Sequence, residues 1–539
     1  MSFENIRGPT KAINPIDPNC LLDVDHFSSN FRLTAIMGSI GPSSRSIDVL
    51  MKMIGAGMDI ARILLSHMSY HHQAETIHNI RKAAKMYSEQ QGFEIPVAIA
   101  LEMRGAEVRT GTLEGGVMDE VKLTKGELVR LSTNRDYTER GNADTIYVDY
   151  DNITLFVKPG TRIFLDHGRI GLIALEVEVN TILCKIENSG LLGSRVSVSV
   201  PEVVMDIPPI TDRDRSDLKF CVEQKIDFVI VSFARSAELV EHVRQILGEK
   251  GKQIKIIAKI ETKEGIENLT EIIQAADGIF IGRGHMGVEM PLEKIFLGQK
   301  AIISRCNKAG KPVVCGSQLL GSMVKMPRPT RAEVNDVANV VLDGADCLVL
   351  TRETAKSHYP VEAIAAVDRI CIEAEAALWH HHLFVELIEK LQNLDAANSI
   401  GIAAVEAATK SNSTAIIVIT TSGKSAFLIA KYKPRVPIIA VTRYSETARQ
   451  ANIYRGIIPL VYHDPPMHDW TKDVDARVQF GLRYGALQGF INNGDSVVIV
   501  TGWREGSGFT NTLRIIYAFN TSVSPEKDDE TMIHNIVNF

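Results

Sequence analysis

The sequence predicts an α/β protein: a (β/α)8 TIM barrel that carries an inserted β-barrel domain and is followed by a C-terminal α/β domain. Short apolar runs alternate with amphipathic segments in two parts of the chain, as parallel strands and crossover helices do. Period-two alternation with glycine turns separates these parts, and strand–helix alternation returns after them. The predicted organisation is an N-terminal arm (1–30), a barrel (31–106 and 210–378), a β domain (107–209), an α/β domain (379–518) and a polar tail (519–539).

Seven runs in the barrel ranges are apolar and β-branched, as strands covered on both faces should be. They are IARILLS (60–66), VAIALE (97–102), FVIVSF (228–233), IKIIAKIE (254–261), GIFIG (278–282), PVVCGS (312–317) and CLVLT (347–351). Amphipathic segments such as 237–251 and 291–310 separate them, and Gly310 ends the second as a helix stop. About eight such units close a barrel.

Composition narrows the class of protein. With 539 residues, 45% hydrophobic and 23% charged, the chain is expected to be soluble, globular and divided into two or three domains. A net charge of −6 gives no indication of a nucleic-acid or membrane partner, and no apolar run approaches the ~18 residues of a membrane span. The polar N-terminus does not resemble a signal peptide, and the seven scattered cysteines are read as reduced thiols, so a cytoplasmic location is expected.

Polar side chains gather where the predicted barrel strands end, which is where a TIM barrel places its active site. They are Arg62, Ser66, His67, Glu102, Arg104, Ser232, Arg235, Lys259, Glu261, Arg283, His285, Ser317 and Glu353. Several cations beside a few carboxylates suit a phosphorylated, anionic substrate with a divalent metal. Each charge alone is more commonly a solvated loop residue, and Lys259 with Glu261 is equally consistent with a structural salt bridge.

The segment RGHMG (283–287) follows the apolar run GIFIG and is read as a glycine turn with an imidazole at its tip. From residue types alone, His285 could be a catalytic group, a metal ligand or the replacement of a lost carboxylate.

A series of motifs resembles the pyruvate kinase family along nearly the whole chain. They are SIGPSSR (39–45), RGAEVRTG (104–111), KIETKEG (259–265), GRGHMGVE (282–289), KPVVCGSQLL (311–320), PRPTRAEVNDVAN (327–339), LDGADC (342–347), ETAKSHYP (353–360) and TGWREGSGFTNT (501–512). The resemblance implies a barrel, a β domain that caps the active site and an α/β regulatory domain, usually in a tetramer. It implies phosphoryl transfer from phosphoenolpyruvate to ADP, giving pyruvate and ATP in the final step of glycolysis.

The resemblance assigns roles to individual positions. Catalysis falls on Lys259, which would stabilise the transferring phosphoryl group, on Arg62, which would grip the substrate phosphate, and on Ser317, which stands where the family has threonine. The substrate-binding residues are Arg62, Ser232, Lys259, Gly284, His285 and Ser317, and the nucleotide-binding residues are Pro42, His67 and Arg109.

Both cation sites depart from the family pattern. Glu261 matches one carboxylate ligand of the divalent ion, but His285 replaces the second, so weaker Mg2+ binding or a drift to Mn2+ or Zn2+ is expected. At the K+ site Ser66 is kept and Glu102 replaces aspartate, whereas Leu64 and Met103 replace asparagine and threonine. K+ dependence is therefore in doubt. Members without K+ usually carry lysine at the position of Glu107, where this chain keeps glutamate.

Three further departures are predicted to lie near the same pocket. Val196 replaces a lysine that would bind nucleotide phosphates, His167 replaces an aspartate, and Arg352 stands before Glu353 where the family has glycine. These changes leave a second hypothesis beside an active enzyme: a catalytically impaired paralogue that binds an effector or joins hetero-oligomers.

The predicted regulatory domain keeps an effector pattern. TTSGKSA (420–426) follows a strand and opens a helix, so its backbone N–H groups can cradle a phosphate, although a GKS at a helix start is by itself a modest signal. The resemblance assigns an effector site, possible ligand fructose bisphosphate, to Thr421, Ser422, Gly423, Lys424, Ser425, Trp470, Arg477, Gly506 and Gly508. The expected partners are phosphoenolpyruvate, ADP or ATP, and further subunits of a homo- or hetero-tetramer.

Overall fold

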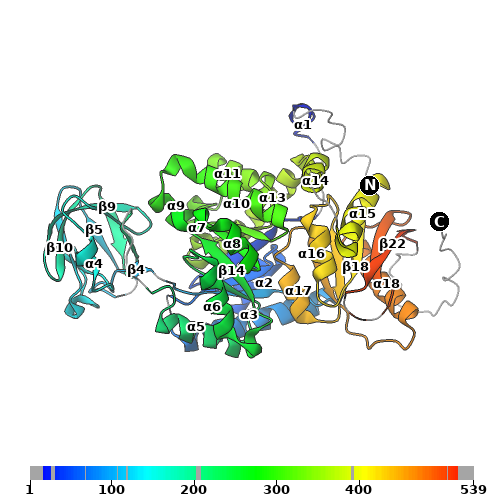
Figure 1. Ribbon diagram of the computed structural model, residues 1–539, viewed down its shortest axis with the longest axis horizontal. Coiled ribbons are helices and arrows are strands. Elements are labelled where there is room, and N and C mark those ends of the chain that lie inside the picture. The colour runs from blue at the N-terminus through cyan, green and yellow to red at the C-terminus, as the bar shows by residue number, and fades with distance from the viewer. Residues whose placement is uncertain are drawn as a thin grey trace.

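The computed structural model describes residues 16–25, 31–66, 68–105, 107–116, 119–201, 208–389, 394–504, 506 and 508–519. His67, most of the predicted arm and nearly all of the predicted tail lie outside these residues. Three domains lie in a row, with the barrel in the middle (Figure 1).

Eight parallel strands close the central barrel in the order β1-β17-β16-β15-β14-β13-β3-β2. They are β1 (Ala35–Ser39), β2 (Ile60–Leu64), β3 (Ala98–Glu102), β13 (Phe228–Val231), β14 (Lys255–Ile260), β15 (Gly278–Gly282), β16 (Val313–Gly316) and β17 (Cys347–Leu350). Seven of them are the predicted runs. Sequence reasoning missed β1, because its sequence AIMGS ends in glycine and serine and lacks β-branched repetition.

Side chains alternate along these strands between the barrel interior and the helix layer. Phe228, Phe280 and Val349 belong to the inner cluster, whereas Ile256, Ile279 and Leu348 pack with the outer helices. Those helices include α2 (Ile47–Gly55), α3 (Tyr70–Gln91), α5 (Asp212–Glu223), α6 (Ala237–Leu247), α7 (Lys263–Glu267), α8 (Leu269–Ala275), α10 (Ile295–Ala309), α11 (Arg331–Leu342) and α13 (Pro360–Ala377). The predicted stop after α10 is confirmed, since Gly310 adopts a left-handed conformation with φ of 72°.

The inserted domain, which we call the cap, is a curled sheet of seven strands in the order β4-β12-β8-β9-β10-β6-β7. These are β4 (Val108–Arg109), β12 (Ser197–Ser199), β8 (Arg162–Leu165), β9 (Ile170–Val177), β10 (Thr181–Ile186), β6 (Leu128–Ser132) and β7 (Thr145–Tyr147); β5 (Glu120–Leu123) pairs separately with β11 (Gly190–Gly193), and α4 covers Ile153–Phe156. One isolated bridge, between Thr110 and Val148, ties the two edges of the curled sheet together.

The C-terminal domain is a five-stranded sheet in the order β20-β19-β18-β21-β22. Its strands are β18 (Ala415–Ile419), β19 (Ile438–Thr442), β20 (Ile457–Val461), β21 (Ser496–Gly502) and β22 (Thr510–Tyr517), and its helices are α15 (Ala396–Lys410), α16 (Lys424–Lys431), α17 (Ser445–Ala451) and α18 (Trp470–Leu487). The antiparallel edge strand β22 begins inside the motif TGWREGSGFTNT (501–512). Shorter helices are α1 (Asp17–Cys20), α9 (Arg283–Glu289), α12 (Arg352–Ala355) and α14 (His380–Ile388).

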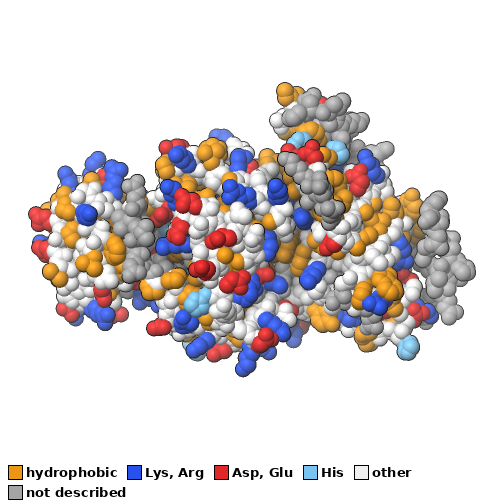
Figure 2. Space-filling view, viewed as in Figure 1, with side chains coloured by type: hydrophobic (Ala, Val, Ile, Leu, Met, Phe, Trp, Pro, Cys, Tyr) orange, Lys and Arg blue, Asp and Glu red, His pale blue; other side chains and the backbone are white. Residues whose placement is uncertain are grey.

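The visible surface mixes side chains of both charges. Figure 2 shows Lys and Arg side chains interspersed with Asp and Glu over the visible face, so the described part of this face carries no large region of one charge. Among the described residues, no helix is long and apolar enough to cross a membrane.

Candidate active site

Four buried side chains of alternating charge, Arg62, Glu102, Lys259 and Glu261, form a row at the mouth of the barrel. Arg62 on β2 donates from Nε and Nη2 to Glu102 Oε2 at 2.7 and 2.6 Å, and its Nη1 donates to Ser39 Oγ at 2.7 Å. Lys259 Nζ lies 3.1 Å from Glu102 Oε1 and 2.8 Å from Glu261 Oε1. The predicted convergence of these strand ends is borne out by the contacts themselves, which join β2, β3 and β14.

The electrostatics favour the charged forms of Glu102 and Lys259. Burial would raise the pKa of Glu102, but Arg62 and Lys259 outweigh it and the net shift is downward. Burial likewise opposes the charge of Lys259, but Glu102 and Glu261 raise its pKa. The ammonium also lies 5.3 Å from the centroid of the Phe280 ring, a cation–π contact on the barrel axis side. Lys259 is therefore a fixed positive charge at the mouth.

Three further predicted substrate residues, Ser232, Gly284 and Ser317, follow the neighbouring strands β13, β15 and β16. Ser232, at the end of β13, donates its hydroxyl to the Met103 carbonyl at 2.9 Å. Gly284 lies beside Ser317, since a Cβ added at Gly284 would meet the Ser317 side chain at 3.7 Å. Ser317 itself adopts a φ of 84°, which is uncommon for a residue other than glycine and marks a constrained turn.

The RGHMG segment is a short helix and not the predicted glycine turn. Helix α9 begins at Arg283, directly after β15, and both Arg283 nitrogens Nη1 and Nη2 bind the Asp336 carboxylate at 2.8 Å. Helical geometry turns His285 inward, where its side chain is 11% exposed. Periodicity could not reveal this, because α9 has only seven residues.

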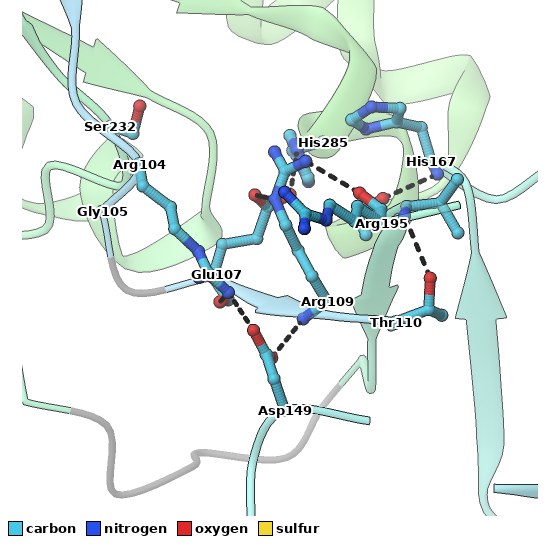
Figure 3. A network of polar contacts seen from close by, with 12 residues as sticks. Arg104, Gly105, Glu107, Arg109, Thr110, Asp149, His167, Arg195, Ser232 and His285 are labelled. Atoms are coloured by element: carbon cyan, nitrogen blue, oxygen red, sulfur yellow. Dashed lines mark hydrogen bonds and ion pairs between the residues drawn. The ribbon is translucent and has the colours of Figure 1, made fainter. Parts of the chain in front are cut away.

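His285 faces carboxylates from two domains. Its Nε2 lies 3.3 Å from Glu107 Oε1, at the start of the cap, and 4.0 Å from Glu261 Oε1. The ring of Phe233 approaches it at a centroid distance of 5.0 Å. The ring of His167 approaches it at 4.3 Å (Figure 3). Glu107 was considered at the sequence level only as a potassium-related position, and its contact with His285 had no sequence signal.

Burial raises the pKa of Glu107, but Arg109 and His285 outweigh it and hold the pKa well below its usual range. Arg109 Nε lies 2.5 Å from Glu107 Oε2, and its Nη1 donates to the Arg195 carbonyl at 2.9 Å. Of the predicted nucleotide residues, Arg109 thus lines the junction of barrel and cap, and Pro42 is exposed on the loop after β1. Val196 packs partly against the hydrophobic core of the cap.

The donor set suits a divalent ion incompletely. Glu261 already accepts from Lys259 through Oε1 and from the Phe233 backbone N–H through Oε2, at 3.1 Å. In the described chain, no three His, Cys, Asp or Glu side chains stand in a metal-binding arrangement. Glu261 could hold Mg2+ only together with substrate oxygens and water, which is a common way of binding Mg2+, and the imidazole of His285 is better matched to Mn2+ or Zn2+.

The predicted monovalent site does not fit K+. Both oxygens of Glu102 are engaged by Arg62 and Lys259, and Met103 is buried in the barrel core. Leu64 offers no side-chain oxygen, so Ser66 is the remaining side-chain donor of the predicted set. The carboxylate of Glu102 thus contacts the cationic side chains of the mouth.

The structure brings part of the predicted effector site together. The exposed residues 421 and 422 precede Gly423, whose φ of 79° leads into α16, and Ser425 Oγ lies 2.5 Å from Thr510 Oγ1 on β22. Lys424 is exposed, and Gly506 and Gly508 have positive φ in the facing loop. Arg477 is different: it is buried, lies 2.6 Å from Asp473 Oδ2 and stacks on Trp470. It would have to leave this pair to bind an anion.

Comparison with known proteins agrees with this arrangement. The family model for the pyruvate kinase barrel domain matches residues 31–364, and the model for its alpha/beta domain matches residues 398–516. The chain belongs to the pyruvate kinase family. Pyruvate kinase PKLR of Homo sapiens is 48% identical over 92% of this chain and 87% of its own length. The pyruvate kinase of Candida albicans is 39% identical over 91% of this chain and 96% of its own length. The predicted family, architecture and phosphotransferase class are thereby confirmed.

Proposed function

We propose that this pyruvate kinase transfers the phosphoryl group of phosphoenolpyruvate to ADP at the barrel mouth, with Lys259 as the central catalytic residue. One observation carries the assignment: a buried, permanently charged ammonium stands at the ends of β2, β3 and β14, between Glu102 and Glu261. Phosphoryl transfer needs mainly positioning and charge neutralisation, and this ammonium supplies a fixed positive charge.

The neighbouring residues complete the proposed mechanism. Arg62, held by Ser39 and Glu102, would bind the substrate phosphate, with Ser232 and the backbone of Gly284 placing the rest of the substrate. Ser317 would pass a proton to the enolate through water, since its side chain lies beside Gly284. A divalent ion, Mg2+ or Mn2+, would neutralise phosphate charge beside Glu261. Pro42, His67 and Arg109 are the proposed nucleotide contacts.

A steady-state assay of pyruvate formation tests this function. The wild-type chain should turn over with Mg2+ or Mn2+, measured with and without K+, whereas Lys259→Met should lower kcat by about 10²–10³-fold or more. No turnover with any ion, in protein shown to be folded, would contradict the proposal. It would favour the second hypothesis, an impaired paralogue that acts through effector binding or hetero-oligomers.

We also propose that the loop 421–425 and α16 bind a sugar bisphosphate. The loop ends at the N-terminus of an eight-residue helix, and the exposed Lys424 adds a positive charge. Titration calorimetry with fructose 1,6-bisphosphate should show binding that Lys424→Glu removes. Absence of heat and of any thermal stabilisation would reject this site.

A tetrameric assembly and a cytoplasmic location are further proposals. Leu292, just before α10, is 72% exposed, and Phe296 and Leu297, at the start of α10, are 54% and 53% exposed. Tyr517 on the edge strand β22 is 62% exposed. Contiguous exposed apolar surface commonly marks contacts between subunits. Six of the seven cysteines are buried and all seven are free thiols, which suits a reducing compartment. Light scattering would measure the assembly.

A further inference from the structure

An ion pair joins the barrel to the cap at a position where this chain departs from its family. Arg352 Nη2, on the barrel, lies 2.9 Å from Asp166 Oδ1, on the cap. The Asp166 side chain is 8% exposed and that of Arg352 is 47% exposed. A glycine at position 352, as in the family motif, could make no such pair. The contact is therefore a property of this chain's own sequence.

The cap side of the ion pair is a rigid turn between β8 and β9. Asp166, His167 and Gly168 have consecutive φ values of 48°, 55° and 83°, so two residues other than glycine are held in the left-handed region. Strand β12 fixes the turn, because the backbone of Ser197 accepts from Asp166 N–H and the Ser197 hydroxyl accepts from His167 N–H, each at 3.0 Å. The turn consequently moves with the whole cap.

The barrel side is equally fixed. Arg352 opens helix α12, and the adjacent Glu353 is buried and anchored by backbone N–H groups: Thr351 donates to its Oε2 at 2.7 Å and Leu320 to its Oε1 at 3.3 Å. An ion pair between two fixed supports resists separation of the domains that carry them.

The same turn touches helix α9 of the barrel. The rings of His167 and His285 meet edge to face across the domain boundary, as Figure 3 shows. A Cβ added at Gly168 would lie 3.3 Å from Val288 Cγ2. His167 and His285 thus contact each other at this interface, and Arg352 contacts Asp166, the residue next to His167.

We propose that Arg352 is a positioning residue that holds the cap turn 166–168 closed over the nucleotide side of the barrel mouth. The predicted effect on KM rests on the proposed function, whereas the predicted effect on cap closure does not. Because Arg352 is half-exposed, the pair should shift the closed-to-open ratio only about two- to fivefold. The expected kinetic result is a change in KM for ADP and not in KM for phosphoenolpyruvate, because Arg109, one of the proposed nucleotide contacts, lies at the junction of barrel and cap.

The chain supplies a matched control. Asp166 has a second arginine partner, Arg169, at 3.2 Å, and that pair lies wholly within the cap. Arg352→Gln and Arg169→Gln each remove one arginine partner of Asp166, but only the Arg352–Asp166 pair crosses the domain boundary. Arg352→Lys keeps the charge and serves as the conservative variant, and Asp166→Asn removes the shared partner.

Hydrogen exchange of the full chain without ligand provides a readout that needs no turnover. Arg352→Gln should speed exchange in peptides covering 107–112 and 164–170 about two- to fivefold, and Arg169→Gln should leave the first peptide unchanged. Where the protein turns over, Arg352→Gln should raise KM for ADP by a similar factor, and Arg352→Lys should restore most of it.

A double-mutant cycle completes the test. Asp166→Asn and Arg352→Gln should be non-additive in exchange rate, because either removes the same pair. The proposal is overturned if Arg352→Gln and Arg169→Gln give equal exchange at 107–112, or if the cycle is additive. An inactive wild-type chain would contradict the proposed function while the exchange experiment still decided the role of Arg352.

Discussion

Lys259 Nζ lies 3.1 Å from Glu102 Oε1 and 2.8 Å from Glu261 Oε1, so two carboxylates already neutralise the residue assigned to the transferring phosphoryl group. Glu102 also binds Arg62, the residue assigned to the substrate phosphate. A phosphate that enters the mouth must therefore compete with Glu102 for both cations. We therefore expect the length of the Glu102 side chain to affect substrate affinity.

Glu102→Asp should lower KM for phosphoenolpyruvate about two- to fivefold, a gain of ~0.5–1 kcal/mol in binding, because the shorter side chain withdraws from Lys259. Steady-state kinetics at fixed ADP measure this. Glu102→Gln is the control for charge: it leaves two buried cations with less compensation and should destabilise the fold by about 3 kcal/mol. An unchanged KM in a folded Glu102→Asp protein would show that the competition is unimportant.

His285→Asp should raise the apparent affinity for Mg2+ about tenfold or more, because a carboxylate would replace an imidazole 4.0 Å from Glu261 Oε1. The same change brings a third carboxylate close to Glu107 and Glu261, so without a divalent ion the variant should unfold at lower temperature than wild type.

Mg2+ titration of activity and of the melting temperature gives both readouts for position 285. His285→Asn, which has the shape of aspartate without its charge, separates the two effects: it should not gain Mg2+ affinity. If His285→Asp lowers activity at saturating Mg2+, the imidazole has a role of its own in this enzyme.

The fold followed from sequence periodicity because seven barrel strands are apolar runs of four to six residues between amphipathic helices. Strand β1 was not predicted, because its sequence AIMGS has no such pattern and the strand is defined by its pairing with β2 and β17. The site residues were found where a strand end or a family motif marked them. Glu107–His285 and Asp166–Arg352 could not be predicted, because each joins residues from different domains whose docking is a tertiary property.

Asp217 should make the free energy of unfolding decrease as pH rises, opposite to the usual effect of a carboxylate. Burial raises its pKa to about 6, although a hydrogen bond from Tyr70 Oη at 2.5 Å opposes the shift. The folded pKa exceeds the unfolded value, so this group's contribution to stability is fully present below about pH 4 and is lost as pH rises through 6.

Asp217→Asn should therefore gain stability relative to wild type between pH 4.5 and 7.5, by up to about 2 kcal/mol. Urea unfolding at the two pH values, with each variant compared to wild type at the same pH, measures the difference. Asp212→Asn, on the same helix α5 but exposed, is the matched control and should show no such trend. A difference that stays constant with pH would show that Asp217 does not titrate in this range.

Gly282 and Gly284 form a matched pair for testing the Glu261 position. A Cβ at Gly282 would lie 2.6 Å from Glu261 Cγ, whereas a Cβ at Gly284 would lie 3.7 Å from Ser317 in ordinary contact. Gly282→Ala should force Glu261 aside, destabilise the fold by about 1–3 kcal/mol and weaken activation by divalent ions. Gly284→Ala should leave the unfolding free energy within about 0.5 kcal/mol of wild type. Equal losses of stability in both variants would contradict the prediction that a Cβ at position 282 displaces Glu261.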